Sequence, residues 1–178
     1  MLLCFASTAQ DIRHIADSVR MRRRVPGLVY AVISSDKIFV SGAVGFKQLR
    51  TKDSISLTNR FHIGNATASF TSFIAAQLVA KGKIVWTTKL IQQFPALTKR
   101  MRPEYKAVTL ADLLSQQAGF PVYNVFSDFA NVPAHSGTLP VQRYKLVEWL
   151  VLQPGRTDTT TKRSVHFSNA NTAVAVAM

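Results

Sequence analysis

The stretch Phe61-His62-Ile63-Gly64-Asn65-Ala66-Thr67-Ala68-Ser69-Phe70-Thr71 decides how this chain folds and what it can do. Its apolar start is typical of a strand end, its glycine is typical of a turn, and helical spacing of apolar residues follows. This spacing predicts a helix over residues 65–80, which Gly82 is expected to stop. Asn65 and Ala68 lie three positions apart, so the helix places both side chains on one face.

This stretch resembles the sequence Phe-Arg-Ile-Gly-Ser-x-Thr-Lys-Ser-Phe-Thr of the serine β-lactamase and penicillin-binding-protein family, in particular its class C β-lactamase, D,D-peptidase and esterase branch. In that family the serine is the nucleophile and the lysine takes its proton. These two positions fall on Asn65 and Ala68. A carboxamide neither ionises nor attacks a carbonyl at a useful rate, and a methyl group accepts no proton. The resemblance therefore implies the family's fold without its acyl-transfer chemistry.

The family's second catalytic motif is Tyr-x-Asn, and Phe167-Ser168-Asn169 resembles it. Asn169 is retained, whereas Phe167 stands at the tyrosine position. A phenyl ring keeps the packing of a tyrosine but lacks its titratable hydroxyl. The resemblance thus assigns the catalytic positions to Asn65, Ala68, Phe167 and Asn169, of which the first three are substituted.

Three further segments resemble the family in the same order along the chain. Residues 25–33 resemble an Ile-Pro-Gly opening with a strand, residues 41–46 resemble the second strand, and residues 108–121 resemble Ile-Thr-Ile-Arg-His-Leu-Leu-Ser-His-Thr-Ser-Gly-Leu-Pro. The resemblance implies an α+β fold of the α/β sandwich type, in which an antiparallel β-sheet packs against helices. We expect a tail over residues 1–9 and an incomplete β-lactamase-related domain over residues 10–178.

The family's third motif, Lys-Thr-Gly or His-x-Gly on a late strand, has no counterpart before Met178. The resemblance therefore implies a C-terminally truncated domain. Such a domain leaves apolar faces and strand edges without partners, which predicts self-association or a partner chain that completes the sheet. It also implies a residual cleft that would take a small amide or ester ligand.

Hydrophobic periodicity and turn residues predict the remaining elements. Ser35-Asp36 separates two apolar runs and predicts the turn of a β-hairpin, and Thr109 is expected to cap a short helix. The expected ranges are helix 8–20, strands 25–34 and 37–43, a strand and polar loop over 45–57, helices 89–94, 110–117 and 142–152, and a loop over 122–140.

The 178 residues carry a net charge of +13, with 47% hydrophobic and 17% charged residues, a composition typical of a globular chain. The basic clusters Arg22-Arg23-Arg24, 99–102 and Lys162-Arg163 lie at predicted junctions. We therefore interpret them as solvated loop charge, and nucleic-acid binding remains a minor hypothesis.

The four histidines show no metal-ligand spacing and no glycine-rich phosphate loop is present, so no cofactor is predicted. No apolar run is long enough to predict a transmembrane helix. The resemblance implies a secreted or periplasmic location, and no complete signal peptide is visible.

Three functions stay open at this point. The favoured one is a member of the family without catalytic activity. The second is an active serine hydrolase of the β-lactamase, D,D-peptidase or esterase type that uses Ser69, Ser72 or Ser168 with a base that the sequence does not identify. The third is a basic interaction module that binds anionic polymers.

Overall fold

The structure is a computed structural model and describes residues 7–156 and 164–178. The chain divides into two compact units, Met1–His62 (unit 1) and Ile63–Met178 (unit 2). Helices accompany a two-stranded antiparallel sheet, so the expected α+β class is confirmed. None of the helices in the described part of the chain is long and apolar enough to cross a membrane.

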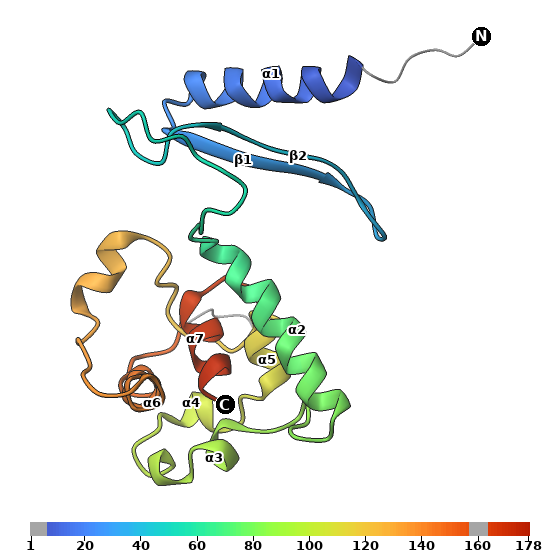
Figure 1. Ribbon diagram of the computed structural model, residues 1–178. Helices are drawn as coiled ribbons and strands as arrows, with labels where there is room; N and C mark the ends of the chain where they lie inside the picture. The colour runs from blue at the N-terminus through green and yellow to red at the C-terminus, as the bar shows by residue number, and fades with distance from the viewer. Residues whose placement is uncertain (1–6, 157–163) are drawn as a thin grey trace. The chain divides into compact units, whose positions relative to one another are not determined.

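Unit 1 consists of a helix packed on a β-hairpin. Helix α1 (Ser7–Arg22) lies along one face of strands β1 (Gly27–Ile33) and β2 (Ile38–Gly45), as Figure 1 shows. The strands pair antiparallel, and the N–H of Ser34 donates to the carbonyl of Lys37 at 2.8 Å to close the turn. The predicted helix and hairpin are therefore confirmed. Helix α1 begins within the segment assigned to a tail, of which the first six residues lie outside the described ones.

The strand expected within residues 45–57 is reduced to one isolated bridge between Phe46 and Ser54. The prediction of a regular strand there is wrong, because polar side chains in the segment bond to each other and shape a loop instead. Lys47 Nζ, for example, lies 2.9 Å from Asp53 Oδ2.

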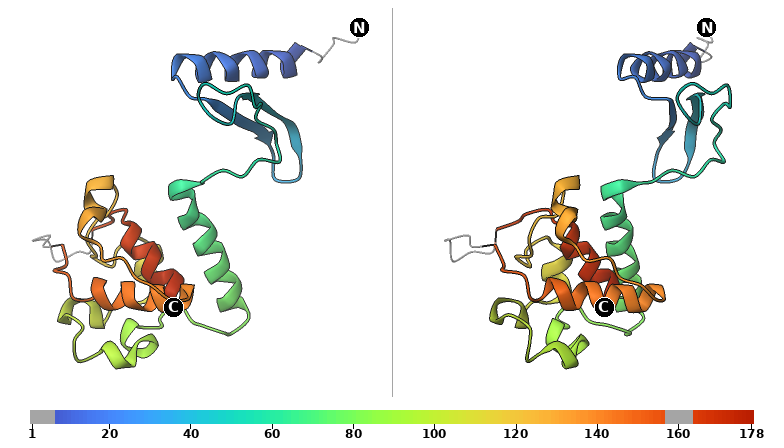
Figure 2. Two further views of the ribbon diagram at one scale, coloured as in Figure 1. Left: turned by 60° about the vertical axis from the view of Figure 1, so that its left-hand side comes forward. Right: turned by 90° about the vertical axis from the view of Figure 1, so that its left-hand side faces the viewer.

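Helices and the loops between them make up the described part of unit 2, apart from one isolated bridge between Lys89 and Thr109, and Figure 2 shows the helices from two further sides. Its core lies among the short helices and the last two long ones, where the ring of Tyr105 stacks on Phe120 with centroids 4.1 Å apart. The elements are η1 (Gly64–Ala66), α2 (Thr67–Ala80), α3 (Leu90–Gln93), η2 (Pro95–Leu97), α4 (Pro103–Lys106), α5 (Leu110–Leu114), η3 (Phe126–Asn131), α6 (Leu139–Leu150) and α7 (Asn169–Ala177).

Most predicted helices are present, with shifted ends. Helix α5 begins after Thr109, whose hydroxyl accepts from the N–H of Asp112 at 3.2 Å while the Asp112 carboxylate accepts from the N–H of Thr109 at 2.9 Å. This reciprocal capping confirms the predicted N-cap. Helix α6 begins earlier than expected, because Pro140 occupies the first turn, where a helix tolerates proline. The expected loop over 122–140 contains the short helix η3.

Helix α2 ends as predicted at Gly82. The N–H groups of Gly82 and Lys83 donate to the carbonyls of Val79 and Leu78, both at 2.9 Å, and Gly82 adopts a φ of +64°. This is a Schellman motif, which favours glycine at that position because positive φ strains other residues.

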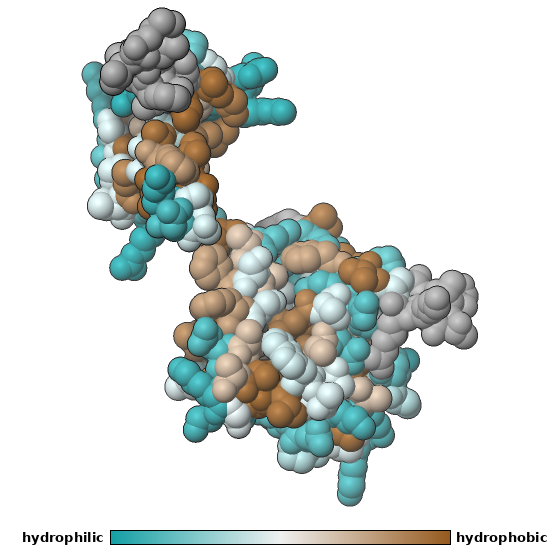
Figure 3. All heavy atoms as spheres, turned by 90° about the vertical axis from the view of Figure 1, so that its right-hand side faces the viewer, coloured by the Kyte–Doolittle hydropathy of each residue, from teal (hydrophilic) through white to brown (hydrophobic). Residues whose placement is uncertain are grey.

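The side chains of α2 are mostly exposed within unit 2. Ala75 is its buried residue, whereas Phe70 and Phe73 are 60% and 63% exposed. Figure 3 shows apolar residues on the face of unit 2 along which α2 runs. A helix that is apolar on all sides is typical of a protein interior. The buried core cluster of unit 2 is formed by residues outside α2.

Candidate functional site

The first pair of candidate residues lies at the start of α2. Gly64 has a φ of +53°, a conformation that glycine adopts without strain, and it opens the short turn η1. Helix α2 follows this turn directly, as the sequence predicts. Asn65 is exposed and Ala68 is half-buried, and their spacing places both on one helix face. The face therefore offers a carboxamide and a methyl group.

The hydroxyls near this turn are not set up for nucleophilic attack. Ser72 donates its hydroxyl to the carbonyl of Ala68 at 3.0 Å, which is a helix-internal bond. Ser69 is exposed, and among the described residues no histidine, lysine or carboxylate bonds to it. An activated serine needs a base within hydrogen-bond reach. Neither serine meets this requirement.

The second pair of candidate residues lies at the start of α7. Ser168 is the N-cap of this helix, because its hydroxyl accepts from the N–H of Ala170 at 3.1 Å. The same hydroxyl donates to the carbonyl of Pro121 at 2.5 Å, and the residue is fully buried. Both of these bonds hold backbone groups, so Ser168 has a structural role and is inaccessible to a substrate.

Gln116 fixes the start of α7 from the turn after α5. Its side-chain Oε1 accepts from the N–H of Ser168 and from Nδ2 of Asn171, both at 2.9 Å. Its backbone carbonyl also accepts from the N–H of His166 at 2.9 Å. Gln116 has a φ of +62°, which is uncommon for a residue other than glycine. The rare backbone conformation brings one side chain to two buried donors.

Two asparagines join the candidate motif to the segment before η3. Asn169 donates its Nδ2 to the carbonyl of Tyr123 at 2.8 Å, and Asn124 donates its Nδ2 to the carbonyl of Phe167 at 2.8 Å. Tyr123 also has a positive φ, of 45°. The Phe167-Ser168-Asn169 segment is therefore held by bonds on both sides of its cap.

The phenol of Tyr123 lies on the segment that bonds to Asn169 and is not set up as a proton acceptor. Burial, and after it the carboxylate of Asp128, raises the pKa of this phenol above its ordinary value. A phenol with a raised pKa stays protonated near neutral pH and accepts no proton from a serine. The ring of Tyr123 instead packs near Trp149, with centroids 5.8 Å apart.

The two pairs of candidate residues lie on helices that contact each other. Helices α2 and α7 pack together and run in the same direction in Figures 1 and 2, so both first turns lie at the same end of unit 2. No hydrogen bond among the described residues links Asn65 to Phe167 or Asn169. The fold gathers the four candidate positions at one end without bonding them to each other.

Sequence reasoning did not find the residues that hold this site. Gln116, Asn124 and Asn171 bond to segments that are more than forty residues distant in the chain. Asn171 Oδ1 and Thr172 Oγ1 are buried without a hydrogen-bond partner in the part of the chain described. Of these three residues, only Gln116 could be placed from the sequence, because it lies in the polar turn before Gly119. Its side-chain partners are set by tertiary structure.

Metal chemistry has no evident ligand set here. Within residues 7–156 and 164–178, no three His, Cys, Asp or Glu side chains gather where they could hold a metal ion. The basic cluster Lys162-Arg163 lies outside the described residues.

The family model described as Beta-lactamase matches residues 8–158, which is most of the chain. The chain therefore belongs to the β-lactamase family, as its motifs predict. No curated protein matches it at a significant level.

Solved structures share this fold. The crystal structure of a β-lactamase from Sulfitobacter sp. EE-36 matches with a TM-score of 0.65 and 21% identity, covering 97% of this chain and 46% of that one. The octameric penicillin-binding protein homologue from Pyrococcus abyssi matches with a TM-score of 0.65 and 17% identity, covering 94% of this chain and 37% of that one. The chain thus spans less than half the length of either structure, and both confirm the expected fold.

Proposed function

We propose that this chain is a β-lactamase-family domain without acyl-transfer activity, which binds a small amide or ester ligand and does not turn it over. In this proposal residues 10–178 form one β-lactamase-related domain, which spans less than half the length of the matched structures, after a tail over residues 1–9. Asn65, Ala68, Phe167 and Asn169 occupy the family's serine, lysine, tyrosine and asparagine positions. The observation that carries the proposal is that Asn65, exposed on η1, and Ala68, half-buried on the first turn of α2, share one face, where neither side chain can attack or accept a proton.

The surrounding hydroxyls support the same conclusion. Ser72 and Ser168 have their hydroxyls bonded to backbone carbonyls, and Ser69 has no described base beside it. In a coupled catalytic unit, losing one member can cost on the order of a million-fold in rate. Replacement of three members predicts no measurable turnover.

Ligand binding is supported by the two amide side chains that the candidate site offers. Asn65 is exposed and offers both donors and an acceptor, and Asn169 keeps its Oδ1 free of described donors while its Nδ2 is held by Tyr123. A carboxamide can donate a hydrogen bond to the C=O of an amide or ester and can accept one from the N–H of an amide. Such hydrogen bonds favour binding and supply no nucleophile.

The catalytic half of the proposal is tested with nitrocefin, p-nitrophenyl acetate and a fluorescent penicillin. We expect no hydrolysis above buffer and no covalent adduct in the intact mass spectrum. A stoichiometric adduct on this chain would overturn the proposal and favour an active hydrolase. Substitution of the labelled serine by alanine would then identify the nucleophile.

The binding half is tested by calorimetric titration with benzylpenicillin and with N-acetyl-D-alanyl-D-alanine. Asn65→Ala should weaken binding by about 2- to 10-fold, the value of one or two net hydrogen bonds. Gln77→Ala is the matched control, because Gln77 is an exposed amide near the other end of α2. Equal affinities for the two variants, or no binding by the unaltered chain, would refute a ligand at this turn.

We also propose that β1 takes up a further strand from polypeptide that corresponds to the part of the fold this chain does not cover. Among the described residues β1 pairs with β2 alone, so its other edge carries unpaired backbone groups, and its almost continuous apolar run is typical of a strand covered on both faces. Ile33 is nevertheless 68% exposed. Light scattering of the chain alone should show association that Ile33→Lys reduces. A monodisperse monomer at all concentrations would argue against this partner strand.

A further inference from the structure

Unit 1 contains two adjoining hollows that the proposed function does not use. The larger, of about 600 Å³, lies between α1, the end of β2 and the loop after it, and the smaller is about 290 Å³. Both are lined by Arg20, Met21 and Phe46, so they form one two-lobed depression. We call it the basic groove. Its combined size is within the range of small-ligand and peptide pockets.

Four arginines line the basic groove: Arg13, Arg20, Arg24 and Arg50. Asp17 is the only carboxylate among the described lining residues, and its Oδ1 already accepts from Arg20 Nε at 2.6 Å. The side chains of Arg13, Arg24 and Arg50 make no ion pair or hydrogen bond with the described residues. The groove therefore presents an excess of guanidinium groups, which bind carboxylates in a bidentate manner.

Two of these arginines have a backbone conformation that is unfavourable for their residue type. Arg24 has a φ of +54° and Arg50 a φ of +65°. Arg24 occupies the C-terminal capping position of α1, where the N–H of Val25 donates to Arg20 and glycine is usual. Strained residues of this kind gather at functional sites. Here the strain coincides with the unpaired charges of the smaller hollow.

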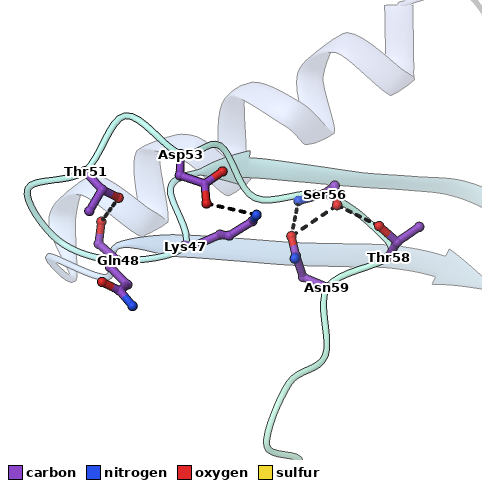
Figure 4. Close-up of polar contacts among 7 residues, drawn as sticks. All are labelled: Lys47, Gln48, Thr51, Asp53, Ser56, Thr58 and Asn59. Atoms are coloured by element: carbon purple, nitrogen blue, oxygen red, sulfur yellow. Dashed lines mark hydrogen bonds and ion pairs between the residues drawn. The ribbon is translucent and has the colours of Figure 1, made fainter.

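The loop that carries Arg50 is fixed by its own polar contacts, which Figure 4 shows. Lys47 Nζ lies 2.9 Å from Asp53 Oδ2, and Thr51 Oγ1 donates to the carbonyl of Gln48 at 3.0 Å. The carboxylate of Asp53 is thus paired with Lys47 and leaves Arg50 unneutralised. The loop holds Arg50 at the groove with its charge available.

Apolar side chains form part of the lining of the basic groove. Val44 is buried at the base, and Phe46 and Leu49 on the loop are 40% and 67% exposed. An apolar base with guanidinium groups around it is complementary to a ligand that carries both apolar groups and carboxylates. An amphipathic acidic peptide combines these two properties.

We propose that the basic groove of unit 1 binds an acidic, amphipathic polypeptide segment, whose apolar side chains cover the base and whose carboxylates pair with Arg13, Arg24 and Arg50. Along α1, Arg13 to Arg24 spans about 16 Å, which matches a helix of about eleven residues. A second copy of this chain is disfavoured because each copy carries a charge of +13. A nucleic acid is disfavoured because single-strand sites use several aromatic platforms, and Phe46 is the aromatic residue among the described lining.

The test uses fluorescence anisotropy with a fluorescein-labelled peptide of about twelve residues, in which Leu and Glu alternate at helical spacing. We expect saturable binding that weakens with added salt, and no binding of the peptide with Gln in place of Glu. The double variant Arg24→Gln with Arg50→Gln should lose at least about 10-fold in affinity. Its control, Lys37→Gln with Lys52→Gln, removes the same charge outside the groove and should change affinity less than about 2-fold.

A second pair of variants separates charge from backbone strain. Arg24→Gly with Arg50→Gly should weaken binding as the glutamines do, but should raise the melting temperature, because glycine adopts positive φ without strain. Equal losses in the groove and control variants would overturn the proposal. So would tighter groove-dependent binding to an oligothymidylate or to phosphatidylglycerol vesicles, which would assign the groove to nucleic acid or lipid. Circular dichroism of each variant checks that unit 1 remains folded.

Discussion

Replacing Gln116 by alanine tests whether the candidate site is held by this one side chain. The change removes the Oε1 that accepts from the N–H of Ser168 and from Nδ2 of Asn171, both at 2.9 Å. Ser168 and Asn171 are 0% and 1% exposed, so water does not replace the lost acceptor. The backbone bond from the N–H of His166 remains. The variant therefore leaves two buried donors without their acceptor.

The expected loss follows from these two donors. Each buried donor without a partner costs about 1–3 kcal/mol, so Gln116→Ala should lower the free energy of unfolding of unit 2 by about 2–6 kcal/mol. Backbone strain at this position does not change, because alanine and glutamine are both unfavourable at positive φ. With a urea m-value of about 2 kcal/mol/M, the midpoint should fall by about 1–3 M.

Tryptophan fluorescence during urea unfolding measures this change in the right unit, because Trp86 and Trp149 both lie in unit 2. Gln117→Ala is the matched control, since its side chain makes no hydrogen bond with described residues. It should shift the midpoint little. If Gln116→Ala and Gln117→Ala have the same midpoint, the amide network does not hold α7 and the account of the site is wrong.

Three further predictions concern single groups of unit 2. Burial raises the pKa of the Tyr105 phenol above its ordinary value of 10.0, so the unfolded chain loses this proton first as pH rises. Unit 2 should therefore lose stability above about pH 10. Tyr105→Phe should reduce the slope of the free energy of unfolding against pH, and it should cost about 1 kcal/mol because it removes the hydrogen bond to the carbonyl of Gln153. Urea midpoints from pH 8 to 11 would measure both effects. Thr172→Val replaces a buried, unpartnered hydroxyl and should leave the urea midpoint unchanged or raise it, whereas Ser168→Ala loses a cap and should cost about 1–2 kcal/mol. Gly64→Ala should cost about 1 kcal/mol, because its φ of +53° strains alanine although the space around it is open, and thermal unfolding would measure the loss.

The sequence predicts those elements whose signals are local. The turn at Ser35-Asp36, the stop at Gly82 and the cap at Thr109 each depend on contacts within a few residues, and each is confirmed. The family assignment also follows from short motifs in a fixed order, and the family model over residues 8–158 confirms it. Local chemistry and motif order are thus readable from a single sequence.

Two other features could not be predicted, for a different physical reason. The acceptor role of Gln116 depends on donors at Ser168 and Asn171, which only the tertiary fold brings to it. The exposure of Phe70 and Phe73 likewise depends on what packs against α2, whereas helical periodicity reports only that the helix is apolar. Burial and long-range pairing are properties of the assembled structure.

The groups that hold the candidate site in place differ from the side chain at its first candidate position, Asn65. Backbone carbonyls, Gln116, Ser168 and Asn169 fix the segment before α7, while the side chain of Asn65 is exposed and makes no hydrogen bond with the described residues. Substitutions of the Asn65 side chain therefore carry little penalty in folding. Asn65→Ser should leave the unfolding midpoint of unit 2 unchanged, whereas Ser168→Ala should lower it. On this argument the fold of unit 2 tolerates different side chains at position 65, because its stability rests on bonds that other residues make.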